Sequence, residues 1–593
     1  MSLLSRIISR ITPSSKFFSD LWSLARPYWL SEERWIARGL VAMVVGLSLT
    51  AVYITVLVNH WNAAFYNALQ EFNRAEFFRQ LLIFAGLTAA NVVVAVYQVY
   101  FNQMLQIRWR RWLTEHFLDD WLANQTYYRM ALQRSGTDNP DQRISEDMGL
   151  FVVYTTSFSL GILSAVVTLT SFVAILWGLS GTLMIPLGRV GTLPMHGYMV
   201  WAALFYAVGG TWLTVIIGRP LVQLSFDQQR YEADFRFSLA RFRDNAESIA
   251  LYRGEAGERV RFRDRFGDIL RNYRSTMERQ KRLTSFTWAF GQLALVFPIL
   301  VAAPRYFIGQ LQLGGLMQTA QAFKEVQGSL SFIINSYPEI ARWQAVVDRL
   351  VEFRDTMHAV ADARSGTPRI EIVRDGRPGI HIQQLSLNLP DGTPLLTDFD
   401  ATVPPGGSLF ISGPSGSGKT TLLRAISGIW PFGRGRIELP DGQHTVTIPH
   451  QPYLPLGTLR RTLTGIGSSE TDEQPPTTAA AAADDTELLR VLSLCGLGYL
   501  AERLDEEENW AQSLSPSEQT CLAFARLLVL RPDSIFLDEV TSAVDETTEA
   551  NLYGVLRDEL PNASVISVGH RETLSKLHDQ RIELQPRSDR EVT

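Results

Sequence analysis

Long apolar stretches between residues 35 and 345 are the feature that most constrains the fold. Each has close to the ~20 residues that a helix needs to cross ~30 Å of hydrocarbon. Because backbone polar groups have no water partners inside a bilayer, such stretches can cross it only as helices. Five are clear: Trp35–Val58, Phe77–Phe101, Phe151–Leu179, Gly197–Ile217 and Phe286–Phe307. The first part of the chain is therefore predicted to be an all-α transmembrane domain.

A sixth stretch, Gly315–Ser336, is more polar than the others. It contains Gln318, Gln321, Lys324, Glu325, Gln327 and Asn335. Such a helix is costly against lipid but is tolerated beside a water-filled cavity, so we predict six membrane helices. Two interpretations remain for Lys324 and Glu325. They line a cavity or couple protons, or they lie near a helix end and extend to water.

The distribution of Lys and Arg predicts that both termini are cytoplasmic. The N-terminal segment and the second and fourth connections are rich in Arg, whereas the first, third and fifth contain little beyond Arg74, Arg189 and Arg305. In Tyr231–Ile249, apolar residues recur at three- and four-residue steps, so this long connection is predicted to be helical. It either carries motion to a cytoplasmic domain or is a solvated hairpin.

The overall composition averages two different halves. A net charge of -5 and 46% hydrophobic residues describe neither half well. No basic excess points to nucleic acid as a partner. The two cysteines, Cys495 and Cys521, lack metal-ligand spacing and are predicted to be reduced thiols.

A charged segment near Arg364–Asp375 separates the halves, and alternating apolar residues begin at Ile380. We therefore predict four parts. They are an N-terminal cytoplasmic amphipathic segment 1–34, a transmembrane domain 35–345, a linker 346–379, and an α/β domain 380–593 with a disordered insertion at 468–486.

A glycine-rich loop in the α/β domain follows the apolar strand Ser408–Ser412 and precedes a helix. It fits the pattern of a phosphate-binding loop in the required strand–loop–helix context. In such loops, backbone N–H groups surround the phosphates, a lysine reaches the terminal phosphates and a hydroxyl binds Mg²⁺. The predicted ATP-binding residues are Gly413, Pro414, Ser415, Gly416, Ser417, Gly418, Lys419, Thr420 and Thr421, with Thr420 as a metal ligand.

Two carboxylates end a second apolar strand, Ile535–Leu537. We predict that Asp538 belongs to the Mg²⁺ site and that Glu539 is the general base for the attacking water. His570 follows the apolar strand Ala563–Val568 and is predicted to contact the terminal phosphate. Taken alone, a histidine at a strand end is more often structural.

The order of these motifs resembles the nucleotide-binding domain of ABC transporters. The matching residues are the phosphate loop, Pro452-Tyr453, Leu514-Ser515, Asp538-Glu539, Ser542–Asp545 and His570. The resemblance implies an exporter-like six-helix membrane domain joined to an α/β P-loop domain, and a transport-coupled ATPase. It also implies that Ser515, Ser517, Glu518 and Asp545 contact nucleotide bound to a second subunit, in a homodimer or a heterodimer.

The membrane half resembles the SbmA/BacA-like family in its branch with a fused cassette. That branch includes a mycobacterial cobalamin and peptide importer and the YddA-type proteins, and the peroxisomal acyl-CoA transporters are more distant. The resemblance implies import of large hydrophilic cargo, such as peptides or cobalamin, across the bacterial inner membrane. It rests on Arg26–Trp29, Trp61-Asn62, Phe65–Leu69, Asp138–Arg143 and Ile175–Thr182.

Three residues depart from the cassette pattern. Pro516 and Ser517 replace the two glycines of the signature motif, and His450 occupies the position of a Mg²⁺-sensing glutamine. Proline is acceptable at a helix start. Ser517 places a side chain where glycine lets the backbone approach phosphate. Gln451 lies one residue after that position, and on a strand-like segment a shift of one residue turns the side chain to the opposite face. Gln451 is therefore not expected to replace the glutamine fully. ATP binding should survive, while hydrolysis is slowed unless Ser517 is tolerated.

Three hypotheses for function therefore remain open. The first is ATP-driven transport of a large hydrophilic solute. The second is a carrier driven by the proton gradient whose cassette binds ATP as a regulatory ligand. The third is a regulatory membrane protein that transports nothing.

Overall fold

The computed structural model describes residues 15–132, 139–186, 192–362, 370–465 and 484–585. The chain divides into two compact units. The helical unit comprises residues 1–123 and 136–357, and the α/β unit comprises residues 124–135 and 358–593. Most of the predicted insertion 468–486 and Asp138 of the membrane motif lie outside the described residues.

The helical unit is built from long helices. Five segments that contain them, namely Arg34–Gln70, Arg74–Leu132, Pro140–Ser180, Tyr198–Asp244 and Glu255–Phe307, are long and apolar enough to cross a membrane. The five clear spans expected from the sequence are thus confirmed as helices of membrane-crossing length and composition. The helices are α2 (Ser15–Leu30), α3 (Arg34–Gln70), α4 (Arg74–Leu122), α6 (Pro140–Gln142), α7 (Met148–Ser180), α8 (Tyr198–Asp244), α9 (Ala246–Tyr252), α10 (Glu255–Phe307), α11 (Leu313–Asn335) and α12 (Tyr337–Asp362), with a π-helix at Arg143–Asp147 and strands β1 (Thr182–Pro186) and β2 (Thr192–His196).

The predicted sixth helix is α11, and two of its glutamines accept hydrogen bonds from α3. Asn59 Nδ2 donates to the Gln318 carbonyl at 3.1 Å, and Asn62 donates to the Gln321 side chain. The apolar residues of α11, including Phe323, pack into a core shared with α7, α8 and α10. The helix is therefore held in the bundle by apolar packing and by amide hydrogen bonds to α3.

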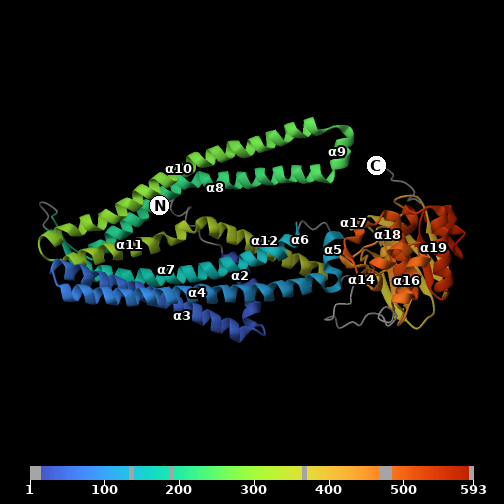
Figure 1. Ribbon diagram of the computed structural model, residues 1–593, viewed down its shortest axis with the longest axis horizontal. Helices are drawn as coiled ribbons and strands as arrows, with labels where there is room; N and C mark the ends of the chain where they lie inside the picture. Colours follow the sequence, from blue (N-terminus) through green and yellow to red (C-terminus); the bar gives the residue numbers. More distant parts are fainter. Residues whose placement is uncertain (1–14, 133–138, 187–191, 363–369, 466–483, 586–593) are drawn as a thin grey trace. The chain divides into compact units, whose positions relative to one another are not determined.

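The fourth connection is helical throughout, as expected from its apolar spacing. Helices α8 and α10 lie side by side and are joined by the short α9 (Figure 1). At 47 residues, α8 is about 70 Å long at ~1.5 Å per residue, more than twice the thickness of the hydrocarbon. Both helices therefore continue well beyond any membrane.

The boundary of the linker differs from the prediction. Residues 346–362 belong to α12, where Val347, Leu350 and Phe353 are fully buried. The strand β3 (Ile370–Asp375) also begins before Ile380. The linker was inferred from the charged segment near residues 364–375, whereas residues 346–362 have buried apolar side chains at three- and four-residue steps, which is the period of a helix.

The α/β unit contains a five-stranded parallel sheet in the order β13-β6-β12-β11-β8 and a four-stranded sheet in the order β3-β7-β4-β5. An α/β P-loop architecture was predicted, and its strand–loop–helix element is present. The strands are β3, β4 (Ile380–Asn388), β5 (Pro394–Val403), β6 (Ser408–Ser412), β7 (Gly433–Pro440), β8 (Thr445–Ile448), β9 (Gly457–Thr458), β10 (Glu507–Glu508), β11 (Ser534–Asp538), β12 (Ser564–Val568) and β13 (Gln580–Glu583). The helices are α5 (Thr126–Leu132), α13 (Lys419–Ile426), α14 (Leu459–Thr464), α16 (Asp485–Leu494), α17 (Trp510–Ser513), α18 (Pro516–Leu530), α19 (Glu546–Glu559) and α20 (Glu572–Ser575).

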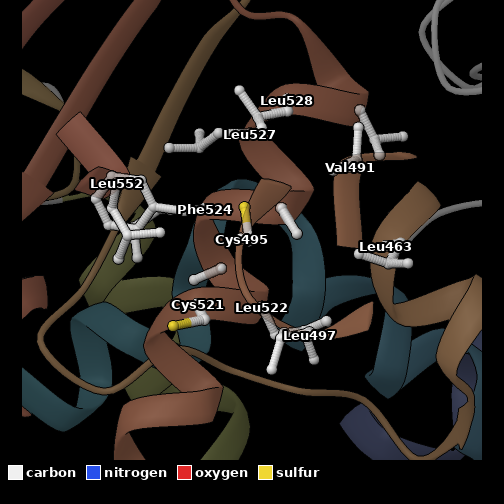
Figure 2. Close-up of a cluster of buried hydrophobic side chains, with 14 of the residues drawn as sticks. Leu463, Val491, Cys495, Leu497, Cys521, Leu522, Phe524, Leu527, Leu528 and Leu552 are labelled. Carbon is white, nitrogen blue, oxygen red and sulfur yellow. The ribbon is translucent and has the colours of Figure 1, made fainter. Parts of the chain in front are cut away.

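Two cores hold the α/β unit together. One contains residues of both sheets and of α13, and Leu132 of α5 packs against it. Residues 124–135, part of the second predicted connection, therefore belong to the α/β unit. The other core surrounds α18 and contains both cysteines (Figure 2).

The two cysteines are free and buried. Burial, and to a lesser degree the nearby Cys521, raises the pKa of Cys495 to about 12, and burial also raises the pKa of Cys521. Since the thiolate is the reactive form, neither side chain should react readily near neutral pH.

We predict that maleimide labels neither cysteine in the folded protein up to about pH 9, where an ordinary thiol with a pKa near 8.5 is largely ionised. Labelling should become complete after denaturation. Mass spectrometry of labelled peptides measures both. The variant Glu502→Cys, at an exposed position, is the positive control. Rapid labelling of native Cys495 at pH 8 would contradict the burial.

Candidate nucleotide-binding site

The site lies where four parallel strands end along one edge of a sheet. Strands β6, β12, β11 and β8 are adjacent in the order β6-β12-β11-β8. Their last residues are in register, since Ile411 pairs with Val568, Val568 with Asp538, and Leu537 with Ile448. Each strand therefore delivers the residues that follow it to the same edge, which is where open α/β sheets bind ligands.

Beyond β6, the phosphate loop adopts a conformation that only glycine accommodates easily. Gly413, Gly416 and Gly418 have φ values of 150°, 82° and 92°. A Cβ atom on Gly413 would lie 2.6 Å from the Leu584 carbonyl oxygen, so no other residue fits there. Pro414, Ser415 and Gly416 are exposed at the tip of the loop, and α13 begins directly after Gly418. The positive end of that helix therefore faces the loop.

The polar groups of the loop fit the phosphates of a nucleotide. The Ser417 hydroxyl is buried and has no hydrogen-bond partner among the described residues. Lys419 is 6% exposed, and its Nζ donates to the carbonyls of Gly413 and Pro414 at 2.9 and 3.0 Å. The ammonium group is thus held inside the loop by weak neutral acceptors. Anionic phosphate oxygens are stronger partners for both side chains.

The hydroxyl and carboxylate expected at a Mg²⁺ site are in direct contact. Thr420 Oγ1 donates to Asp538 Oδ1 at 2.9 Å, and burial raises the pKa of Asp538 above its ordinary value. A carboxylate that is costly to ionise without a partner suits a cation site. Within the described ranges, no group of three or more His, Cys, Asp or Glu residues could hold a metal ion. The Thr420 hydroxyl and the Asp538 carboxylate fit a Mg²⁺ ion bound together with the phosphates of a nucleotide. Thr421 follows Thr420 in the first turn of α13.

Glu539 has an unusual backbone conformation for a residue with a long side chain. Its φ is 48°, in the left-handed region, and its N–H donates to the Val568 carbonyl at 2.9 Å. Such a conformation costs about 1–3 kcal/mol and is concentrated at functional sites. One carboxylate oxygen lies 3.8 Å from Lys419 Nζ. The predicted base is therefore beside the predicted phosphate-binding lysine.

His570 and His450 follow the neighbouring strands. His570 is exposed two residues after β12, and the preceding Gly569 N–H donates to the Ile411 carbonyl at 3.2 Å. His450 Nδ1 lies 3.3 Å from the Glu539 carbonyl oxygen and 3.4 Å from Ser542 Oγ. The residue that departs from the cassette pattern thus contacts the segment that contains the predicted base.

The signature residues begin helix α18 and form a complete capping box. The Ser515 hydroxyl accepts from the Glu518 N–H at 3.3 Å, and the Ser515 N–H donates to Glu518 Oε2 at 2.8 Å. Hydrogen bonds from the hydroxyls of Tyr499 and Ser515 hold the pKa of Glu518 below its usual value. Pro516 is the first helical residue, where proline fits, and Ser517 follows it half-buried.

Asp545 caps helix α19. Its Oδ1 accepts from the N–H groups of Thr547 and Thr548 at 3.0 Å each, which lowers the pKa of its carboxyl. In the described part of the chain, no hydrogen bond or ion pair joins Ser515, Ser517, Glu518 or Asp545 to the phosphate loop. The nucleotide contacts expected of these four residues stay predictions about a second subunit.

Arg571 is a residue of this region that was not selected from the sequence. Its guanidinium donates to the carbonyls of Val544 and Ser542 at 2.9 and 3.2 Å. The only sequence signal was its position directly after His570, and nothing local indicates that its side chain reaches a segment 29 residues earlier.

Comparisons with known proteins agree with this geometry. Residues 24–307 match the family "ABC transporter transmembrane region 2", and residues 396–542 match the family "ABC transporter". The chain is 35% identical to an uncharacterized ABC transporter ATP-binding protein of Haemophilus influenzae, over 99% of this chain and 95% of the relative. It is 34% identical to the inner membrane ABC transporter ATP-binding protein YddA of Escherichia coli, over 94% and 95%. It is 28% identical to the human lysosomal cobalamin transporter ABCD4, over 84% and 83%.

A solved structure has the same fold. A bacterial Atm1-family ABC exporter with ATP bound matches with a TM-score of 0.67, 18% sequence identity, and coverage of 93% of this chain and 94% of that one. The expected fold class, an exporter-like helical membrane domain with an α/β nucleotide-binding domain, is therefore confirmed.

We predict that Lys419→Ala weakens binding of Mg²⁺-ATP by about tenfold or more, because the buried ammonium group is the loop's charged partner for phosphate. Fluorescence titration of the full-length protein with a labelled ATP analogue measures this. Lys576→Ala, which changes a lysine at the end of α20, should leave affinity unchanged. Equal affinity of the Lys419→Ala variant and the unaltered protein would refute the assignment of the loop.

Proposed function

Because this chain belongs to the ABC transporters that join a helical membrane domain to one ATP-binding cassette, a class of transport-coupled ATPases, we propose that it uses ATP to move large hydrophilic solutes across a bacterial inner membrane. The observation that carries the proposal is the arrangement at one sheet edge. There the phosphate loop, the contact between Thr420 and Asp538, and Glu539 come together on the same chain as five helices of membrane-crossing length and composition.

In the proposed reaction, ATP supplies the phosphoryl group and Mg²⁺ neutralises its charge. Lys419 and the N–H groups of the loop would hold the phosphates, while Thr420 and Asp538 would hold a Mg²⁺ ion that offsets their negative charge. Glu539 would orient the attacking water and accept its proton, a role that its distance of 3.8 Å from Lys419 Nζ supports. His570 would donate a hydrogen bond to the terminal phosphate.

The site is completed by a second copy of the chain in this proposal. Ser515, Ser517, Glu518 and Asp545 would act on nucleotide bound to the other subunit of a homodimer, or of a heterodimer. Support comes from their position: Ser515 and Glu518 form the capping box of α18, where Ser517 also lies, and Asp545 caps α19. Ser517 and His450 would then be repeated in both sites of a homodimer and slow hydrolysis there.

For the cargo we propose cobalamin-like molecules or peptides, moved inward. One relative is named a lysosomal cobalamin transporter, and the membrane motifs resemble the SbmA/BacA-like importers. The polar residues of α11 also suit a water-filled path rather than lipid. Both termini would be cytoplasmic, where ATP is available.

A second candidate is a carrier driven by the proton gradient, with ATP as a regulatory ligand. The observation that favours it is Glu325, half-buried on α11 beside Lys324 within the helical unit. An ionisable residue at that depth is a candidate for proton coupling. The departures at Ser517 and His450 would matter little to such a carrier.

We predict that the purified full-length protein hydrolyses ATP and that Glu539→Gln lowers kcat by at least about a hundredfold, because the base is lost. Ser517→Gly should raise kcat by a few-fold, because it restores close backbone approach to phosphate. Release of inorganic phosphate in nanodiscs measures both rates. Ser513→Gly, at an exposed serine just before α18, is the matched control. If hydrolysis is absent and Ser517→Gly restores it, ATP is not the natural energy source.

Vesicle uptake distinguishes the two candidates. We predict that right-side-out vesicles loaded with ATP take up labelled cobalamin or a labelled peptide, whereas inside-out vesicles supplied with external ATP do not. A pH gradient alone should drive none. Uptake with a pH gradient alone, lost in Glu325→Gln, would support the proton-driven carrier instead. No flux under either condition would indicate a regulatory protein.

A further inference from the structure

Glu549 is a buried carboxylate that has no role in the proposed reaction. It lies in the first turns of α19, and its side chain is 1% exposed. Its Oε2 lies 3.4 Å from Arg571 Nη1, and its Oε1 accepts from Thr573 Oγ1 at 3.0 Å. A charge buried this deeply is costly unless it is paired and hydrogen-bonded. The pair therefore fixes the position of the Arg571 guanidinium.

The same guanidinium also holds the backbone that follows Glu539. Nη1 donates to the Val544 carbonyl at 2.9 Å, and Nη2 donates to the Ser542 carbonyl at 3.2 Å. Arginine presents five donors in a rigid planar fork, so one side chain can serve two carbonyls and a carboxylate together. A lysine ammonium group can keep the charge but cannot reproduce this geometry.

These contacts connect two chain segments of the site. We call residues 539–545 the base segment and residues 569–573 the histidine segment. Within the base segment, the Ser542 N–H donates to the Glu539 carbonyl at 3.1 Å. The histidine segment is anchored by Gly569, where an added Cβ would lie 2.9 Å from Leu574 Cδ1. Through its hydrogen bonds to Val544 and Ser542, the Arg571 side chain links the histidine segment to the base segment.

We propose that Arg571, held by Glu549, is a positioning residue that keeps Glu539 and His570 in the mutual geometry needed to act on one phosphate. It reaches the reacting groups only through the backbone of the base segment and through its neighbour His570. The inference rests on the proposed ATP hydrolysis. In this proposal the buried ion pair of Arg571 and Glu549 couples the base segment to the histidine segment.

Arg571→Lys tests the fork without removing the charge. In the full-length protein in nanodiscs, kcat should fall about ten- to hundredfold, since displacements near 1 Å cost rates of this order. The KM for ATP should stay within about twofold, because the phosphate loop is untouched. Arg557→Lys is the matched control: Arg557 also donates to a backbone carbonyl, that of Leu577 at 2.9 Å. A wild-type kcat in Arg571→Lys would overturn the proposal.

A double variant separates positioning from stability. Arg571→Met alone leaves Glu549 buried and unpaired, so the Tm should fall. Adding Glu549→Met removes the second charge and should restore most of the Tm. The kcat of the double variant should stay low, because the carbonyls of Ser542 and Val544 have still lost their donor. Recovery of kcat together with Tm would show that the pair is only structural and would overturn the proposal.

Amide hydrogen exchange tests the coupling independently of hydrolysis. Arg571→Lys should speed exchange in residues 540–545 and in residues 570–573 together, and leave the helix α16 unchanged. This result would support the coupling even if the wild type hydrolysed ATP no faster than Glu539→Gln, an outcome that would refute only the proposed hydrolysis. Unchanged exchange in residues 540–545 would overturn the coupling itself.

Discussion

The shared register of four parallel strands is the constraint on which the site depends. Because Ile411, Val568 and Asp538 pair across β6, β12 and β11, the residues after each strand emerge at one edge. The phosphate loop, His570 and Glu539 are distant in sequence and are brought to the same edge by this register. A parallel sheet buried on both faces allows no slip, since a one-residue shift would exchange the two faces of every strand. The packing of these strands in the core of the α/β unit therefore sets the positions of the site residues.

Local motifs of the site could be predicted from the sequence, and contacts between segments could not. The glycine-rich loop carries its own signal, because its conformation requires glycine at Gly413, Gly416 and Gly418. The contact of His450 with the Glu539 carbonyl joins residues 89 positions apart. The bonds of Arg571 to the base segment are likewise long-range. Such contacts depend on the order of strands in the sheet, which hydrophobic patterns do not specify.

In the membrane half, too, local features could be predicted from the sequence and contacts between helices could not. Hydrophobic length predicted the five clear spans, because lipid permits only helices there. The end of the transmembrane domain was placed too early, since α12 buries apolar residues within a charged sequence. The pairing of Asn59 with α11 was also beyond prediction, because hydropathy identifies helices without their neighbours. Asp147 forms ion pairs with Arg349 and Arg143, at 2.6 and 2.9 Å, next to the motif 138–143. Hydropathy gives no signal for these contacts either.

The departures in the signature motif change one surface and not the local fold. The capping box of Ser515 and Glu518 is complete although both glycines are replaced. Pro516 at the first helical position fixes a φ that the helix already requires. Glu518 gains a further bond from Tyr499, so the start of α18 is held from two sides. The remaining difference from the family pattern is the side chain of Ser517, which is half-buried. In the proposed dimer, this extra hydroxymethyl group would hinder the close approach of α18 to phosphate bound by the other subunit, so its effect would fall on closure of the dimer and not on folding.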